Sequence, residues 1–354
     1  MSSSVNFSVA VILPVYNGAL YIEDTLISLC NQTMLPSEII IVDDGSVDNT
    51  VDIVRSFSKN NTRVDIQLIQ LSANTGAPSA RNYGLMATDA ELVLFMDADD
   101  IVEPELLERE YNRLHEIEKQ MPGKWILCHS ACKIIDSLGN EIAPIVRWKQ
   151  VLPEEILGYQ FVRNNIITPS GVLVRRDEIL SVGGFDPSVR YNDDADLWLK
   201  LAQRGGFAYI DEPLVRVRRH VNNLTSKLRN AIDAEKKLLS KYPIEIIEKA
   251  IYRRYLPWWV NVADFVSVLY RLDYWDKGYT LIKEVVNDKP DYANGFFFLG
   301  LYYLHSKLLE KAINCFHKTI ELDPDNGAAL NNLGVLLALN GKISEALSLF
   351  AKAI

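Results

Sequence analysis

Three carboxylates stand within four residues, directly after a short apolar run. Residues 92–96 are Leu-Val-Leu-Phe-Met, and Asp97, Asp99 and Asp100 follow them. A run of this kind predicts a buried strand that delivers acids to the carboxyl edge of a sheet, where open α/β sheets bind ligands. Adjacent carboxylates repel one another unless a cation offsets them, so we expect a hard divalent metal that carries a phosphate ligand. The alternative is a solvated acidic turn that caps a helix beginning near Pro104.

Composition limits the classes of protein that fit. A chain of 354 residues with 48% hydrophobic content predicts two packed domains. The formal net charge of −9 argues against nucleic acid as the main partner. Cys128 and Cys132 fit a buried strand better than a zinc site, because no second pair of ligands accompanies them. The N-terminus carries no signal-peptide pattern and no run of about eighteen apolar residues occurs, so we expect no membrane span and a cytoplasmic location.

The elements that must position the acids alternate between strand and helix. Strands are predicted at residues 8–13, 38–42, 64–71 and 92–96, and helices at residues 21–32, 51–57 and 80–86. This order implies right-handed crossovers and parallel pairing. The strand ends at Pro14, Asp43 and Asp97 then share one rim of a mostly parallel sheet. Arg81 lies on an intervening helix, and the combination describes a pocket for a nucleotide diphosphate.

Four segments of this half resemble the motifs of glycosyltransferase family 2 in order and spacing. They are residues 11–18 (Val-Ile-Leu-Pro-Val-Tyr-Asn-Gly), 39–46 (Ile-Ile-Ile-Val-Asp-Asp-Gly-Ser), 76–82 (Gly-Ala-Pro-Ser-Ala-Arg-Asn) and 95–100 (Phe-Met-Asp-Ala-Asp-Asp). The resemblance continues to about Thr225. It implies a GT-A fold, which is a Rossmann-like α/β domain, a nucleotide-sugar donor and an inverting mechanism.

The same resemblance implies roles for individual residues. The base would be held by Pro14, Val15, Tyr16 and Asp43, the nucleotide by Arg81, the ribose side by Asp97, and a Mn²⁺ or Mg²⁺ ion by Asp99. Considered alone, each of these residues also fits a purely structural role, such as that of an acid in a turn or a member of a surface ion pair. The constellation is more specific than any of its members.

A second group of acids begins a helix predicted over residues 192–201. Acids in the first turn of a helix interact favourably with the helix dipole, which is a purely structural explanation. Inversion at an anomeric carbon, however, needs a carboxylate that takes the proton of the acceptor. The segment resembles the family motif Glu-Asp-x-x-Leu-Trp, whose aspartate is the general base, and this implies that role for Asp194. Asp196 is the second candidate, and Asp193 stands where glutamate is usual.

Basic and apolar residues alternate over residues 213–220. The alternation predicts an edge strand with a charged outer face. It does not explain His220, which follows the strand. The family has an arginine-x-histidine pattern here, and Arg218 with His220 resembles it, which implies a histidine that ligates the metal or holds the diphosphate and an arginine at the nucleotide.

The last third of the chain repeats itself. Six pairs of like residues are separated by 34 positions: Pro290 and Pro324, Leu299 and Leu333, Gly300 and Gly334, Ala312 and Ala346, Phe316 and Phe350, Ile320 and Ile354. This period resembles tetratricopeptide repeats, which are helix-turn-helix units. The predicted organisation is a catalytic domain (1–230), a helical linker (231–256) and an all-α repeat domain (257–354) with units at about 257–290, 291–324 and 325–354. The last unit lacks a polar capping helix, so we expect further chain beyond it.

Together these features predict a metal-dependent inverting glycosyltransferase. It would move a sugar from a nucleotide-diphosphate donor, uridine-linked by the resemblance at Asp43, to a hydroxyl of a glycan or protein acceptor. The chain lacks the Gln-x-x-Arg-Trp signature of processive synthases, which favours single transfers. The repeats would bind a protein partner or a second copy of the chain. Residues 14–18 lack the glycine-rich basic loop of a sugar nucleotidyltransferase, whereas a catalytically silent scaffold with interacting repeats stays open.

Overall fold

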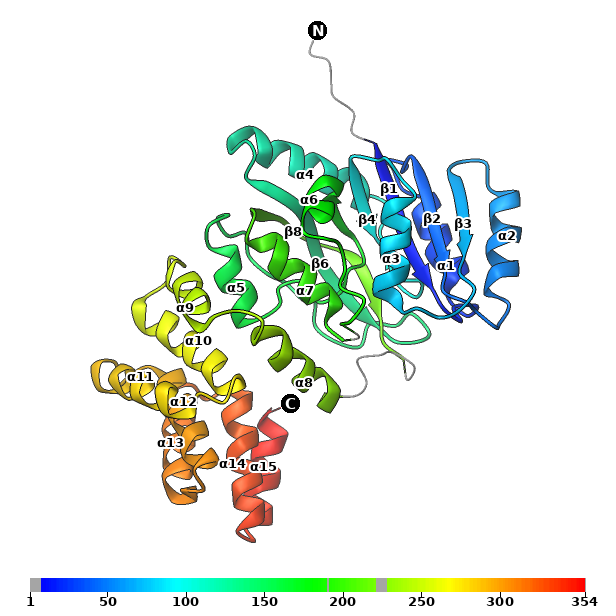
Figure 1. The fold of residues 1–354 in the computed structure, drawn as a ribbon. Helices are drawn as coiled ribbons and strands as arrows, with labels where there is room; N and C mark the ends of the chain where they lie inside the picture. Colours follow the sequence, from blue (N-terminus) through cyan, green and yellow to red (C-terminus); the bar gives the residue numbers. More distant parts are fainter. Residues whose placement is uncertain (1–7, 190, 221–227, 354) are drawn as a thin grey trace. The chain divides into compact units, whose positions relative to one another are not determined.

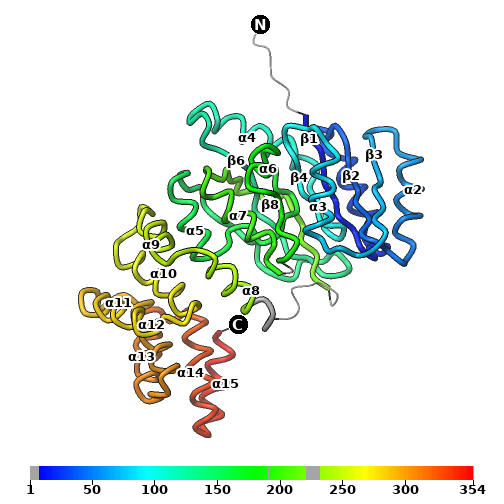
Figure 2. Tube along the Cα trace, viewed as in Figure 1, coloured from blue at the N-terminus to red at the C-terminus, as the bar shows by residue number. Residues whose placement is uncertain are grey.

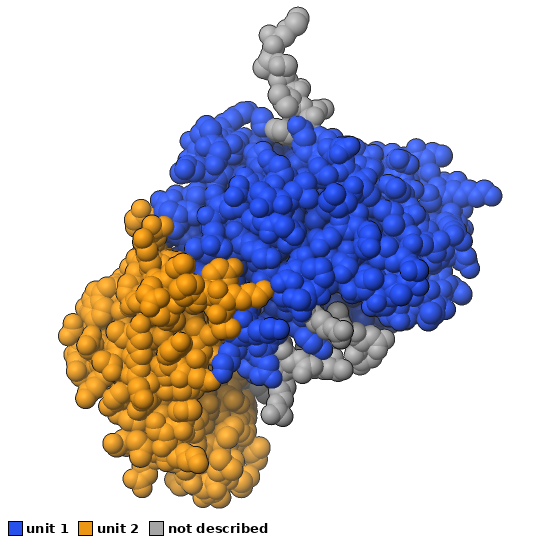
Figure 3. Space-filling view, in the orientation of Figure 1, with its two compact units in different colours: residues 1–238 blue, residues 239–354 orange. Residues whose placement is uncertain are grey.

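Figure 1 shows the computed structural model of the protein, and Figure 2 shows the same view as a trace. It describes residues 8–189, 191–220 and 228–353; Thr225, where we expect the family resemblance to end, and Ile354 lie outside them. The chain divides into two compact units, residues 1–238 and 239–354 (Figure 3). The first is an α/β unit on one sheet and the second is helical throughout its described residues, as the predicted fold class requires.

One mixed sheet forms the frame of the first unit. Its strands are β1 (Val9–Val15), β2 (Glu38–Asp43), β3 (Asp65–Gln70), β4 (Leu92–Phe95), β5 (Ile101–Val102), β6 (Trp125–Ile135), β7 (Val172–Arg175) and β8 (Gly206–Arg218). They are ordered β3-β2-β1-β4-β7-β6-β8-β5. The first four strands pair in parallel, which confirms the predicted parallel pairing. Strand β7 is antiparallel to both of its neighbours, so the other half of the sheet is mixed.

Helices cover both faces of this sheet. They are α1 (Ile22–Cys30), α2 (Thr50–Asn60), α3 (Ala77–Met86), α4 (Leu106–Gln120), α5 (Ile156–Val162), α6 (Arg176–Ser181) and α7 (Asp193–Ala202). Alternate residues of each strand enter different cores: Val11 and Leu13 pack with α1, α2 and α4, whereas Ile12 packs with α3, α5, α6 and α7. Helices α3 and α7 therefore share a face (Figure 2), and their polar residues can meet at its edge.

The prediction of an edge strand at residues 213–220 was wrong. Strand β8 lies between β6 and β5, and its residue Arg216 pairs with Lys133 on one side and Ile101 on the other. Strand β5 has only two residues, which are too few to show a strand period in the sequence. It nevertheless pairs with the side of β8 that was expected to be the edge of the sheet. The strand also ends at Arg218, so His220 lies in the segment beyond it.

Helix pairs with the predicted period build the second unit. Helix α8 (Leu228–Leu239) reaches the boundary, and α9 (Ile244–Tyr252), α10 (Trp258–Arg271), α11 (Trp275–Asp288), α12 (Ala293–His305), α13 (Leu309–Leu322), α14 (Gly327–Leu339) and α15 (Ile343–Ala353) follow. A Cβ at Gly300 would lie 2.7 Å from the ring of Phe316, and one at Gly334 would lie 2.6 Å from Phe350. Each glycine thus lets two helices approach closely across an aromatic ring, as the repeat pattern predicted. Within the described residues, no helix has the length and apolar character needed to cross a membrane.

Candidate functional site

The ends of β1, β2 and β4 meet at one edge of the sheet. Val15 pairs with Asp43, and the amide of Met96 donates to the carbonyl of Ile12 at 3.1 Å. The predicted rim therefore exists, and it carries the segments at residues 14–18, 43–46 and 97–100 side by side. The side chains at this rim come from three separate segments between residues 14 and 100 of the sequence.

The β1 and β2 ends offer groups suited to a nucleobase. Asp43 is buried, and its Oδ2 accepts from the amide of Ser46 at 3.3 Å. Its Oδ1 is buried and has no hydrogen-bond partner among the described residues, so it can accept from an N–H of a ligand. Pro14 and Val15 are buried in β1, whereas the ring of Tyr16, the next residue, is 50% exposed and available for stacking.

Asp44, beside Asp43, has a different task that sequence reasoning missed. Its carboxylate accepts from the amide of Thr75 at 2.7 Å, the hydroxyl of Thr75 at 2.8 Å and the amide of Gly76 at 2.7 Å. These bonds hold the loop that begins α3. The sequence shows that Asp43 and Asp44 are adjacent, but it does not show that Asp44 holds the loop while Asp43 keeps an oxygen free for a ligand.

Arg81 on α3 joins two acidic segments. Its guanidinium is buried and lies 2.7 Å from Asp97 Oδ1 and 2.6 Å from Asp193 Oδ2, and it stacks over the ring of Phe185 at 5.1 Å. Because α3 and α7 cover the same face of the sheet, Arg81 can reach Asp193, which lies 112 positions later in the sequence. The structure thus joins Arg81, predicted to hold the nucleotide, to Asp97, predicted on the ribose side, and adds Asp193, which sequence reasoning noted only as a departure from glutamate.

The carboxyl of Asp194 lies in the same cluster. Burial raises its pKa to about 7, and the neighbouring carboxylate of Asp193 adds to the rise, while the amide of Ala195 opposes it. A carboxyl with a pKa near neutrality can both accept and release a proton at physiological pH. Asp196, in contrast, is fully buried and pairs with Lys200 Nζ at 2.7 Å. The two acids that the sequence left as alternatives therefore differ: Asp194 has a raised pKa, whereas Asp196 is held in an ion pair with Lys200.

Asp99 and His220, the two predicted metal ligands, are in contact. His220 Nε2 lies 2.9 Å from Asp99 Oδ2, and the imidazole stacks on Tyr21 with ring centroids 5.2 Å apart. Burial and the nearby Asp97 carboxylate raise the pKa of Asp99. Among the described residues, no group of three or more His, Cys, Asp or Glu side chains is placed to hold a metal.

Arg218 holds the acidic turn in place. Its guanidinium is buried, donates from Nε to the carbonyl of Asp99 at 2.9 Å and from Nη1 to the carbonyl of Ser137 at 3.1 Å, and lies 4.6 Å from the ring of Tyr21. Its backbone amide donates to Asp100 Oδ1 at 2.8 Å. These contacts fix the position of the turn from the β8 side.

Each of the three acids of the turn contacts another group of the protein. Asp97 pairs with Arg81, Asp99 contacts His220, and Asp100 accepts from the Ser170 hydroxyl at 2.5 Å. Burial and the two neighbouring carboxylates raise the pKa of Asp100 well above its usual value. The acids can therefore coexist without a cation, so their adjacency does not by itself require a metal.

Comparisons with known proteins agree with this arrangement. Residues 10–177 match the family model of glycosyl transferase family 2, and residues 315–348 match a tetratricopeptide repeat. The putative teichuronic acid biosynthesis glycosyltransferase TuaG of Bacillus subtilis is 30% identical over 218 residues, which cover 62% of this chain and 81% of the relative. An uncharacterized glycosyltransferase of Rickettsia typhi is 28% identical over 236 residues, which cover 66% of this chain and 71% of the relative.

Solved structures support the predicted GT-A fold. S. aureus TarS 1–349 in complex with UDP-GlcNAc has a TM-score of 0.54 at 17% identity, covering 97% of this chain and 90% of that chain. The structure of S. aureus TarS has a TM-score of 0.52 and 17% identity, covering 98% of this chain and 54% of that chain.

Proposed function

This chain belongs to glycosyl transferase family 2 and is a glycosyltransferase, and we propose that it moves a single sugar from a UDP-linked donor to an acceptor hydroxyl with inversion. The observation that carries the proposal is the carboxyl of Asp194. Its pKa is raised to about 7 at the start of α7, and Asp193 and Arg81 connect it to Asp97 on the donor edge.

Asp194 is proposed as the general base. The acceptor oxygen forms a bond to the anomeric carbon while the bond from that carbon to the diphosphate breaks, and the diphosphate leaves with the electron pair. The acceptor hydroxyl proton passes to the ionised Asp194 carboxylate. Arg81 holds Asp193 and therefore positions the start of α7 against the donor edge.

A uridine base is proposed for the β1 and β2 ends. The unpartnered Asp43 Oδ1 would accept from an N–H of the base, and the exposed Tyr16 ring would stack on it. The structures of S. aureus TarS in complex with UDP and with UDP-GlcNAc support a UDP-linked donor by fold likeness.

Mn²⁺ or Mg²⁺ is proposed beside the leaving group. Asp99 and His220 fit this role, because a carboxylate and an imidazole already in contact suit Mn²⁺, and such ions often complete their coordination with substrate phosphates and water. When bound, the ion would neutralise charge on the departing diphosphate.

The second unit is proposed to recruit a protein partner or a second copy of the chain, as tetratricopeptide repeats suggest. We propose that one sugar is transferred at a time, because the chain lacks the Gln-x-x-Arg-Trp signature of processive synthases. A cytoplasmic location stays a prediction from the sequence.

A panel of sugar nucleotides tests the function. UDP-glucose, UDP-galactose, UDP-N-acetylglucosamine and GDP-mannose are offered with and without Mn²⁺, and both nucleotide release and thermal stabilisation are measured. We expect at least one UDP-sugar, but not GDP-mannose, to stabilise the protein and to be turned over, and Asp43→Asn to weaken that stabilisation. Binding without any turnover under all conditions would favour the silent scaffold.

A further inference from the structure

The turn that follows α6 brings Phe185 against the end of β4. Gly184, the residue before it, has a φ of +72°, a region that glycine adopts readily, so the chain can reverse at this point. The side chain of Phe185 is buried, and its ring packs edge to face on Phe95 with ring centroids 5.1 Å apart. Phe95 is the last residue of β4, so the ring lies beside the strand end that delivers Asp97.

Asn82 of α3 holds this turn in place. Its side-chain nitrogen donates to the carbonyl of Phe185 at 2.8 Å, and its side-chain oxygen accepts from the N–H of Phe185 at 3.0 Å. One side chain thus satisfies both backbone groups of a residue that lies 103 positions later in the sequence. A Cβ at Gly184 would lie 2.6 Å from Asn82 Oδ1, so the glycine allows this close approach.

The ring of Phe185 supports the guanidinium of Arg81. The Cζ of Arg81 lies 5.1 Å from the ring centroid, which is within the range of a favourable cation–π contact. The Nε of Arg81 is buried and has no hydrogen-bond partner among the described residues. The ring and the two carboxylates of Asp97 and Asp193 therefore have to orient the planar group.

The guanidinium of Arg81 joins two parts of the proposed reaction. One of its carboxylate partners follows β4 at the donor edge, and the other begins α7 beside Asp194. We propose that Asn82 and Phe185 are positioning residues for sugar transfer, which act through Arg81 by holding its guanidinium between the donor edge and the helix that carries the base. This inference rests on the proposed function, because it adds the residues that keep the base in place relative to the donor.

Loosening Arg81 should change the protonation of Asp194. Burial and the carboxylates of Asp193 and Asp97 raise the pKa of Asp194, whereas the amide of Ala195 and the guanidinium of Arg81 lower it. If the guanidinium leaves its position, one lowering contribution is lost, and the pKa of Asp194 should rise further. The acidic limb of the pH dependence of kcat should then move to higher pH, which a loss of packing alone would not cause.

Release of UDP from the UDP-sugar that the wild-type chain turns over tests the inference, with water as the acceptor. Phe185→Leu keeps an apolar side chain but removes the flat ring, so we expect kcat to fall by about tenfold and the acidic limb to move to higher pH. Asn82→Ala leaves the ring present and should show the same changes to a smaller extent. Arg81→Lys keeps the charge but not the fork, and in that background Phe185→Leu should lower kcat by less than about twofold.

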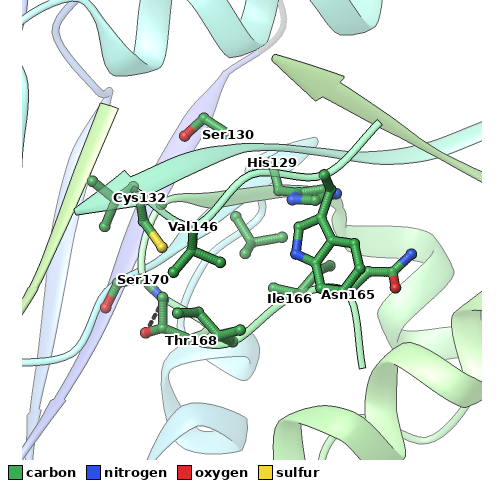
Figure 4. Close-up of a pocket in the computed structure, with 13 residues that line it drawn as sticks. His129, Ser130, Cys132, Val146, Asn165, Ile166, Thr168 and Ser170 are labelled. Atoms are coloured by element: carbon green, nitrogen blue, oxygen red, sulfur yellow. Dashed lines mark hydrogen bonds between the residues drawn. The ribbon is translucent and has the colours of Figure 1, made fainter. Parts of the chain in front are cut away.

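Two variants in the same core control for structural damage. Phe207→Leu removes another buried ring, and should lower stability without moving the acidic limb and change kcat by the same factor with Arg81 or Lys at position 81. Ile166→Val should also leave the limb in place. Figure 4 shows Ile166 in the wall of a pocket beside β6 that has room for about one water molecule.

An equal fall in kcat for Phe185→Leu in both backgrounds, or an acidic limb that stays in place, would overturn the inference. Failure of the wild type to release UDP from every UDP-sugar would instead overturn the proposed function. Urea unfolding then decides the link through Arg81, because a higher pKa of Asp194 in the folded state costs stability as the pH rises. Phe185→Leu should lower the unfolding midpoint more at pH 8 than at pH 5, and Phe207→Leu should lower it equally at both; equal lowering in both variants would reject the link.

Discussion

Replacing Asp194 with asparagine should lower transfer and, at the same time, stabilise the folded protein at neutral and alkaline pH. Asparagine keeps the shape of the side chain but cannot take a proton from the acceptor, so we expect turnover to fall by about 10²- to 10⁴-fold. The affinity for UDP should stay unchanged, because the proposed base-binding groups are at Asp43 and Tyr16.

The stability effect follows from the pKa of Asp194. The folded protein raises it from 3.8 to about 7, a shift of roughly 3 units, which corresponds to about 4 kcal/mol at 1.36 kcal/mol per unit. Well below pH 3.8 both the folded and the unfolded forms hold the proton, and the folded state has its full stability. As the pH rises towards 7, the unfolded form releases the proton first, so the wild type loses stability. The amide of the variant has no such loss.

Urea unfolding of the ligand-free protein at pH 5 and pH 8 measures this difference. The free energy of unfolding of Asp194→Asn should exceed that of the wild type by a larger margin at pH 8 than at pH 5, and the two margins should differ by roughly 2–3 kcal/mol. Asp196→Asn is the matched control on the same helix: it leaves Lys200 without its carboxylate, so it should lower stability at both pH values and retain transfer. The same pH dependence in wild type and Asp194→Asn, or undiminished turnover, would refute the assignment of the base.

Three further changes test other parts of the structure. His220→Ala should raise the Mn²⁺ concentration needed for half-maximal activity by about tenfold or more, whereas His305→Ala in the second unit should not; equal effects would count against the metal site. Gly171→Ala should lower the free energy of unfolding by about 2 kcal/mol more than the control Gly139→Ala. Both glycines have a positive φ, but only a Cβ at position 171 would collide with the side chain of Val215. Equal melting temperatures of the two variants would contradict this close packing. Phe316→Ala should cost about 3–5 kcal/mol in the helical unit, and Phe350→Ala less because Phe350 is only half-buried; the reverse order would reject the proposed packing.

The residues at the rim were recognisable before the fold was known. Apolar runs that end in acids at Asp43 and Asp97 indicated strands with functional ends, and the structure places both at the same edge. These signals are local, because a strand, its alternation and its terminal acid all fall within a few consecutive residues. The family resemblance, and not a local pattern, implied the metal for Asp99 and the metal or the diphosphate for His220, and the two side chains lie in contact.

Other features had no local signal. The Arg81 bridge to Asp193 joins positions 112 residues apart, and no spacing in the chain predicts it. The two-residue strand β5 covers β8 and turned an expected edge strand into an internal one.

The sequence by itself determined the alternation of strands and helices over residues 8–96, the 34-residue repeat and the set of acids available for chemistry, because period and residue type are written along the chain. Only the tertiary structure decided which acid is neutralised, which keeps an unpartnered oxygen and which has a raised pKa. Those properties depend on burial and on distances between charges from different segments, and such distances exist only once the sheet has brought the segments together.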